Sequence, residues 1–113
     1  MTRYLISFDD GAMAHIPVDE WGAVGEAAHA VVRKAKVAGV WIHGGGVEQQ
    51  RASIVGTDGA VAPGPWPETK AVIGGFSIIQ AATRAEALEW AARIASACRC
   101  AQEVRELMDD PQV

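Results

Sequence analysis

The side chain best placed for proton-transfer chemistry is His29, which lies within a predicted helix. At about 100° per residue, its imidazole points roughly 130° from the centre of the apolar stripe of that helix, so it is not simply core filler. Glu26 precedes it by three residues and Arg33 follows it by four, both on its side of the helix. A carboxylate at this spacing can hold an imidazole in one tautomer and raise its basicity. His29 with Glu26 is therefore the candidate acid/base pair, and the alternative is a solvated face with an incidental row of charges.

The segment 63–70 is the candidate for ligand recognition. Its first five residues include three prolines, which exclude a helix or a central strand and predict a stiff loop. A pre-organised loop binds without first having to be ordered. Trp66 offers a flat apolar surface and an N–H donor. The next polar groups are an acid, a hydroxyl and a cation that could pair with a substrate carboxylate: Glu68, Thr69 and Lys70. The alternative is structural, with the prolines shaping a turn that Glu68–Lys70 tether to the sheet or to a second subunit.

The other histidines give weaker signals. His43 closes a predicted strand just before a run of glycines, where strand ends commonly meet loops at a cleft, so it is a candidate substrate-binding residue. A histidine at a strand end is more often a hydrogen-bonded structural residue, and His15 lies in a polar loop where we expect no role.

Neither a metal nor a cofactor is expected. No i, i+4 histidine pair or Cys/His cluster has metal-ligand spacing. The Gly44–Gly46 run lacks the Lys-Ser/Thr ending of a phosphate loop, and Gly74-Gly75 more readily permits close strand packing than phosphate contact. Cys98 falls on a helical stripe that should be buried, where a thiol is inert.

Composition indicates a single domain over residues 1–113, with a tail from about residue 109. The net charge of −4 argues against nucleic-acid binding, which needs a surplus of basic residues on one face. No apolar run reaches the roughly 18–20 residues needed to cross a bilayer. The first residues do not resemble a signal peptide, so we expect a cytoplasmic protein.

The elements that must position these residues alternate as β, α, β, hairpin, β, α, β. Asp19 is the expected N-cap of the first helix, Asp58-Gly59 the two-residue turn of the hairpin, and Thr83 the cap of the second helix. The first helix should bury the stripe that begins at Trp21, and the second the stripe from Ala87 to Cys98. The predicted strands cover 3–8, 40–43, 52–57, 60–62, 72–80 and 102–107, and the predicted helices 19–38 and 84–97.

This order predicts an α+β, ferredoxin-like βαββαβ fold with an extra hairpin. Helices cover one face of such a sheet. The strands here carry apolar residues on both faces, as in residues 3–8, so the second face needs a cover as well. A second copy of the chain is the simplest cover, which predicts a homodimer. A long loop packed on that face is the alternative.

The stretch Gly64-Pro65-Trp66-Pro67-Glu68-Thr69-Lys70, followed after three residues by Gly74-Gly75-Phe76, resembles the D-G-P-F-x-E-T-K-x-x-x-G-G-F signature of the YCII-related (DGPF-motif) family. Glu86-Ala87-Leu88-Glu89-Trp90-Ala91 resembles the E-A-L-E-W-A segment of that family, and Glu103-Val104-Arg105 its closing strand. Together these motifs span most of the chain, although Pro63 and Trp66 replace the Asp and Phe of the signature.

The resemblance implies a dimeric α+β barrel in which two ferredoxin-like sheets pack face to face. It also aligns His29 with a first-helix histidine proposed as acid or base in the wider group. Some relatives resemble enzymes of small-molecule breakdown. The expected function is a cofactor-independent lyase, isomerase or hydrolase-like enzyme acting on an anionic organic substrate. The alternative is a non-catalytic ligand-binding or regulatory module associated with a sigma factor, which the missing Asp at Pro63 favours slightly.

Overall fold

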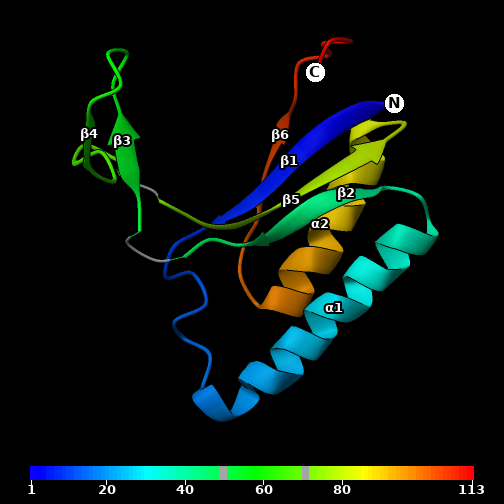
Figure 1. Ribbon diagram of the computed structural model, residues 1–113. Coiled ribbons are helices and arrows are strands. Elements are labelled where there is room, and N and C mark those ends of the chain that lie inside the picture. Colours follow the sequence, from blue (N-terminus) through cyan, green and yellow to red (C-terminus); the bar gives the residue numbers. More distant parts are fainter. Residues whose placement is uncertain (49–50, 70–71) are drawn as a thin grey trace.

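The computed structural model describes residues 1–48, 51–69 and 72–113. The order of elements follows the prediction, with a short 3-10 turn, η1, added before the first helix (Figure 1). The elements are β1 (Thr2–Asp9), η1 (Val18–Glu20), α1 (Trp21–Val37), β2 (Trp41–Gly46), β3 (Ser53–Val55), β4 (Val61–Pro63), β5 (Ile73–Ala81), α2 (Arg84–Cys98) and β6 (Glu103–Glu106).

Four strands form one antiparallel sheet in the order β2-β5-β1-β6. This is the ferredoxin-like arrangement, because each helix connects two parallel strands that have one antiparallel strand between them. Both helices lie on the same face of the sheet (Figure 1). The predicted fold class is therefore confirmed. Within the described residues, no helix is long and apolar enough to cross a membrane.

The hydrophobic core lies between the sheet and α2. Alternate residues of β1 and β5 point to the helices, because successive side chains of a strand face opposite sides. Tyr4 pairs with Ile79 across these two strands, and both are buried. The rest of the buried core cluster is Ile6, Ala81, Ala87, Ala91, Ile94 and Cys98.

The second helix follows the sequence prediction closely. The hydroxyl of Thr83 accepts a hydrogen bond from the backbone N–H of Glu86 at 3.2 Å. The carboxylate of Glu86 accepts one from the backbone N–H of Ala82 at 3.2 Å, so both side chains satisfy amides at the start of the helix. The predicted buried stripe of α2 is confirmed from Ala87 to Cys98, with Trp90 only half-buried.

The start of the first helix differs from the prediction. Asp19 is not the N-cap: it lies within η1, and the cap residue of α1 is Glu20, whose side chain makes no capping hydrogen bond. Trp21 is 57% exposed, so it does not belong to the buried stripe. Val24 and Ala35 are the buried residues of α1. A 3-10 turn precedes α1, and the regular spacing of apolar residues does not predict such a turn.

The second strand continues through the glycine run instead of ending at His43. A Cβ on Gly44 would lie 2.6 Å from the carbonyl oxygen of Phe76 and 2.8 Å from the ring of Trp41. A side chain would not fit there, so the glycine lets β2 approach β5 closely.

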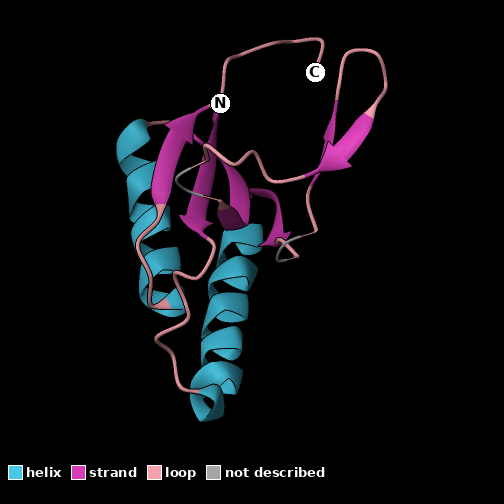
Figure 2. Cartoon of the chain, turned by 90° about the vertical axis from the view of Figure 1, so that its left-hand side faces the viewer, coloured by secondary structure: helices cyan, strands magenta, loops and turns pink. Residues whose placement is uncertain are grey.

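The predicted hairpin exists, but its turn is longer than two residues. Val55 pairs with Val61, which leaves the five residues 56–60 between the strands. The backbone N–H of Gly56 bonds to the carbonyl of Ala60, and the Asp58 carboxylate accepts a bond from the N–H of Ala60. We call β3, β4 and their turn (residues 53–63) the arm. It extends away from the helices and the four-stranded sheet (Figures 1 and 2).

The face of the sheet opposite the helices, which we call the open face, carries apolar side chains, as the strand sequences predicted. Leu5 pairs with Ile78, and Ser7 pairs with Phe76, with these side chains pointing away from the helices. His43 lies beside them, paired with Ile78 and with its ring 6.2 Å from the ring of Phe76. No described helix or strand of the chain packs on this face.

Candidate functional site

A cavity of about 600 Å³ opens between the amino-terminal half of α1 and one end of the sheet. Its other wall is the segment after β1, residues 10–14. The lining is mostly apolar and comes from four parts of the chain: Phe8, Asp10, Gly11, Met13, Ala14, Trp21, Val24, Gly25, Ala28, Gly46, Val47 and Gly74. Pockets for small molecules typically have volumes of roughly 300–1,000 Å³, so the cavity is large enough for a compact ligand.

Two glycines at the start of β5 shape the sheet end of this cavity. A Cβ on Gly75 would lie 2.5 Å from the ring of Phe8, so the absence of a side chain lets that ring lie flat across the strand. A Cβ on Gly74 would lie 2.9 Å from the Cα of Asp10. The prediction that this glycine pair serves close packing is therefore confirmed. This packing places the backbone of β5 against Asp10, which lines the cavity.

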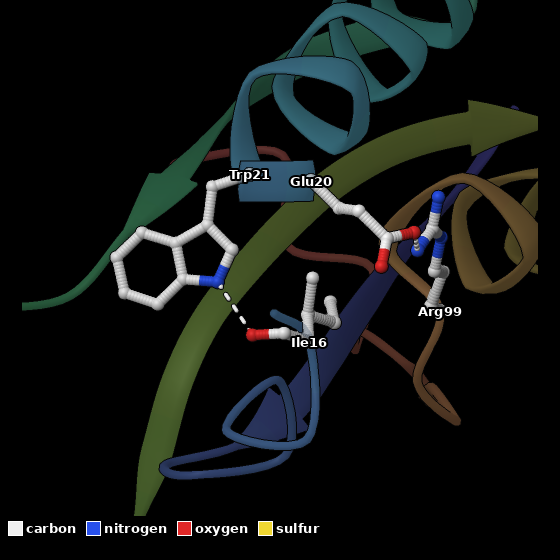
Figure 3. A network of polar contacts seen from close by, with 4 residues as sticks. All are labelled: Ile16, Glu20, Trp21 and Arg99. Carbon is white, nitrogen blue, oxygen red and sulfur yellow. Dashed lines mark hydrogen bonds and ion pairs between the residues drawn. The ribbon is translucent and has the colours of Figure 1, made fainter. Parts of the chain in front are cut away.

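Trp21 forms a wall of the cavity and is fixed by its ring nitrogen. The indole N–H donates a 3.0 Å hydrogen bond to the carbonyl of Ile16, whose side chain is itself buried (Figure 3). Next to it, Arg99 donates a 2.6 Å hydrogen bond to the carboxylate of Glu20, joining η1 to the end of α2. These two contacts hold the segment between β1 and α1 against the rest of the chain.

The chemistry of the cavity is that of an apolar pocket with one carboxylate. Among the described lining residues, Asp10 is the only one with an ionisable side chain, and it is exposed. A carboxylate can take a proton from a bound molecule and return it at another atom. The described lining contains no cation that would pair with an anionic ligand.

His29 lies beside this cavity but not in its lining. It is exposed on α1, directly after Ala28 and one helical turn beyond Gly25, both of which line the cavity. Glu26, its expected partner, instead accepts a 2.9 Å hydrogen bond from Arg33, and both of these side chains are exposed. The described residues therefore bring His29 near the cavity without the orienting carboxylate.

The other predicted site residues lie elsewhere. His43 is exposed on the open face. Trp66 is 61% exposed in the turn after the arm, where its carbonyl accepts a hydrogen bond from the N–H of Thr69. Glu68 and Thr69 are exposed in the same turn, and Lys70 lies outside the described residues. None of the described members of this group lines the cavity.

A second, more polar hollow of about 480 Å³ lies at the ends of β1 and α2. His15 borders it and bonds through Nδ1 to the carbonyl of Ala12 at 3.1 Å. Cys100 also borders it, next to the buried Cys98. Burial raises the pKa of the Cys98 thiol, and the neighbouring Cys100 raises it further. Burial likewise raises the pKa of Cys100. Both thiols therefore stay protonated and weakly nucleophilic near neutral pH, and no group of three potential metal-ligating side chains occurs in residues 1–48, 51–69 and 72–113.

Reasoning from the sequence missed the cavity and Asp10. The pair Asp9-Asp10 was interpretable only as the end of a strand, because both residues precede a glycine. Small and apolar residues from separate segments form the walls, and such residues carry no pattern that indicates a site. The available signal was the glycine pair at 74–75, whose close packing places residue 10 at the cavity.

Comparison with known proteins agrees with this architecture. A family model described as the YCII-related domain matches residues 4–109. Comparison with curated protein sequences finds no match. A solved structure of similar fold is 5-chloro-2-hydroxyhydroquinone dehydrochlorinase (TftG) from Burkholderia phenoliruptrix AC1100, in complex with 2,5-dihydroxybenzoquinone. The TM-score is 0.54 and the identity 16%, over 99% of this chain and 98% of that chain.

Proposed function

Because this chain belongs to the YCII-related family, we propose that it is an enzyme that converts a compact organic molecule bound in the cavity between α1 and the sheet. The observation that carries the proposal is the cavity itself, which is apolar, large enough for a small ring compound and equipped with a carboxylate. We name no particular substrate.

The neighbour of similar fold supports the size and the type of chemistry. TftG is named as a dehydrochlorinase and was solved with a dihydroxylated benzoquinone, which is a small, flat ring. Elimination of HCl needs a base that removes a proton while the carbon–chlorine bond breaks and chloride leaves. Isomerisation needs the same base, which then returns the proton to another atom. A single carboxylate can serve in either reaction without a cofactor.

Asp10 and His29 are the two candidate acid/base groups of this chain. Asp10 lines the cavity, and its backbone N–H donates to the carbonyl of Val72 at the foot of β5, which fixes the position of its backbone. His29 lies one residue beyond a lining alanine and reaches the bound molecule only if its ring turns towards the cavity. We propose Asp10 as the first candidate and His29 as the second.

The polarity of the walls also favours one substrate class. A flat molecule with hydroxyl or carbonyl groups can stack on apolar side chains and give up a proton to a carboxylate. The ligand of the neighbour, 2,5-dihydroxybenzoquinone, is a ring of this kind, and on that ground we propose a hydroxylated ring compound as the substrate class. The anionic substrate predicted from the Glu68–Lys70 segment stays a prediction, because Lys70 lies outside the described residues.

We further propose that the protein works as a homodimer joined through the open face. Leu5, Phe76 and Ile78 form an apolar strip there, flanked by the ion pair between Arg105 and Glu103 at the edge of the sheet. Two copies related by a twofold axis would bury the strip and bring opposite charges of this edge together. A cytoplasmic location and an association with a sigma factor remain predictions from the sequence.

Two glycines in α1 provide a matched test of the cavity. A Cβ on Gly25 or on Gly22 would meet no atom within 4 Å, but only Gly25 lines the cavity. Gly25→Leu should fill the cavity, abolish stabilisation by hydroxylated quinones in a thermal-shift assay and abolish turnover. Gly22→Leu should leave both intact, because Gly22 does not line the cavity. Equal ligand response of the two variants would exclude the cavity as the binding site.

Turnover of chlorinated hydroquinones, with chloride release as readout, then separates the acid/base candidates. Asp10→Asn should lower kcat by about 100-fold or more, which is a typical contribution of acid/base catalysis. Asp109→Asn in the exposed tail is the control and should change nothing. A loss confined to His29→Asn would transfer the catalytic role to His29. Ligand-dependent stabilisation without any conversion of the ligand would favour the alternative, a non-catalytic binding module.

A further inference from the structure

Among the described helices and strands, the arm has no hydrophobic partner in its own chain. Its two strands pair with each other, and neither packs substantially on another described helix or strand. Val55 and Val61 lie directly opposite each other and are 64% and 68% exposed. Trp66, in the turn that follows β4, is 61% exposed. An isolated two-stranded ribbon is at best marginally stable in water, so an exposed valine pair at its centre calls for a covering surface.

The arm is nevertheless built as an ordered unit. At its base, the backbone N–H of Gly64 donates to the carbonyl of Ala52 at 2.9 Å. A Cβ on Gly64 would lie 3.1 Å from the Cβ of Ala52 and 3.3 Å from Ile54, so the base is tightly packed. A partner that binds such a ribbon does not have to order it first, which lowers the entropic cost of association.

The position of the arm connects it with the open face. It leaves the ends of β2 and β5 and extends away from both helices (Figures 1 and 2). Strands β1, β2, β5 and β6 have 8, 6, 9 and 4 residues and lie about 4.8 Å apart, so the face that they offer measures roughly 400–450 Å². A stable interface buries about 800 Å² on each partner. The open face alone is therefore too small for a stable dimer, and the arm is the nearest apolar surface that could enlarge it.

We propose that the arm is a clasp between two copies of this chain, in which the face of Val55 and Val61 packs on the rim of the second copy's sheet. The proposal rests on the homodimer proposed above and adds its second contact. Because a twofold axis repeats every contact, each copy both gives and receives an arm. The dimer then buries four arm valines in addition to the two open faces.

The hydrogen bond at the base of the arm allows a clean excision. Ala52 and Gly64 are already in contact, so residues 53–63 can be replaced by a short Asn-Gly turn. A milder variant, Val55→Thr with Val61→Thr, keeps the β-branched shape and the strand propensity but makes the face polar. The control is Val18→Thr with Val37→Thr, because these valines are 79% and 91% exposed outside the arm.

The measurement is the dimer dissociation constant, from sedimentation equilibrium over a concentration series. We expect the double arm variant and the excision to raise it by about 100-fold or more, as the loss of four buried valines implies. The control should match the wild-type protein. Unchanged dimerisation of both arm variants would overturn the clasp and leave the dimer standing, whereas a monomeric wild-type protein would overturn both. Neither result bears on the cavity, whose test is ligand binding.

Folding of the variants gives a further check by circular dichroism. The arm packs on no other described element, so both arm variants should retain the helical signal of the wild-type protein. Loss of the fold would contradict the proposal, because it would show that the arm stabilises its own chain.

Discussion

The two helices lie on the same sheet face but are built differently. α2 begins with two side chains that satisfy backbone amides, and it buries a continuous row of small and apolar residues against β1 and β5. α1 begins at a residue without a side-chain capping bond, contains glycines at 22 and 25, and exposes its first tryptophan. The helix that borders the cavity thus lacks the local stabilising features of the other. Binding sites are commonly drawn from the less stable parts of a fold, and this difference supports the proposal that the ligand binds beside α1.

The largest test of this difference compares two alanines. Ala87 is fully buried in α2, so Ala87→Leu should force a larger side chain into a closed core and destabilise the protein by about 1–3 kcal/mol. Ala28 lines the cavity on α1, so Ala28→Leu has space and should change the free energy of unfolding by less than about 0.5 kcal/mol. Urea unfolding measures both. Similar losses at the two positions would mean that the cavity is closed in solution.

A smaller effect separates the two helix starts. Thr83→Ala removes the capping bond of α2 and should cost about 1 kcal/mol. Glu20→Ala removes no capping bond from α1 and leaves only the half-exposed ion pair with Arg99 to be lost, which contributes at most about 0.5–1 kcal/mol. Chemical denaturation of both variants checks the order. A larger loss of unfolding free energy in Glu20→Ala than in Thr83→Ala would show that the ion pair with Arg99 stabilises the start of α1 more than the capping bond stabilises α2.

The smallest effect is a pH dependence confined to α2. The folded protein raises the pKa of Cys98 above its ordinary value of 9.0. The stabilisation is therefore fully present below about pH 9 and is lost as the pH rises through the higher folded-state pKa, because the unfolded thiol ionises first. The free energy of unfolding should fall between pH 8 and pH 10, and Cys98→Ala should show a shallower fall. Identical slopes in the two proteins would exclude a contribution from Cys98.

The same contrast explains what could be predicted from the sequence. The course of α2 follows from signals within a few residues, namely Thr83, Glu86 and the apolar stripe after them. The entry of α1 depends on the 3-10 turn and on Ile16 and Arg99, which are distant in sequence from one another. Local periodicity therefore placed Trp21 in the core, whereas its hydrogen bond to the carbonyl of Ile16, which lies outside the helix, holds it as a wall of the cavity.

The site was harder to predict than the fold for a related reason. The four-stranded order follows from alternating strands and helices, which repeat a known topology. The cavity is formed by residues whose only shared property is where the chain brings them, such as Asp10, Ala28 and Gly74. His29 drew attention because its residue type suggests proton transfer. The structure places it next to the cavity, and its catalytic role stays a prediction.

Arg99 carries a consequence for how this protein can change by mutation. It holds a left-handed backbone conformation, with φ of 56°, at the end of α2, where glycine would be about 1 kcal/mol easier to accommodate. Its guanidinium is also the group that holds Glu20 next to the cavity wall. Position 99 is thus subject to two opposing demands, backbone relaxation and long-range attachment. An Arg99→Gly substitution would relax the backbone at the end of α2. It would also remove the ion pair that attaches Glu20, beside the cavity wall, to α2.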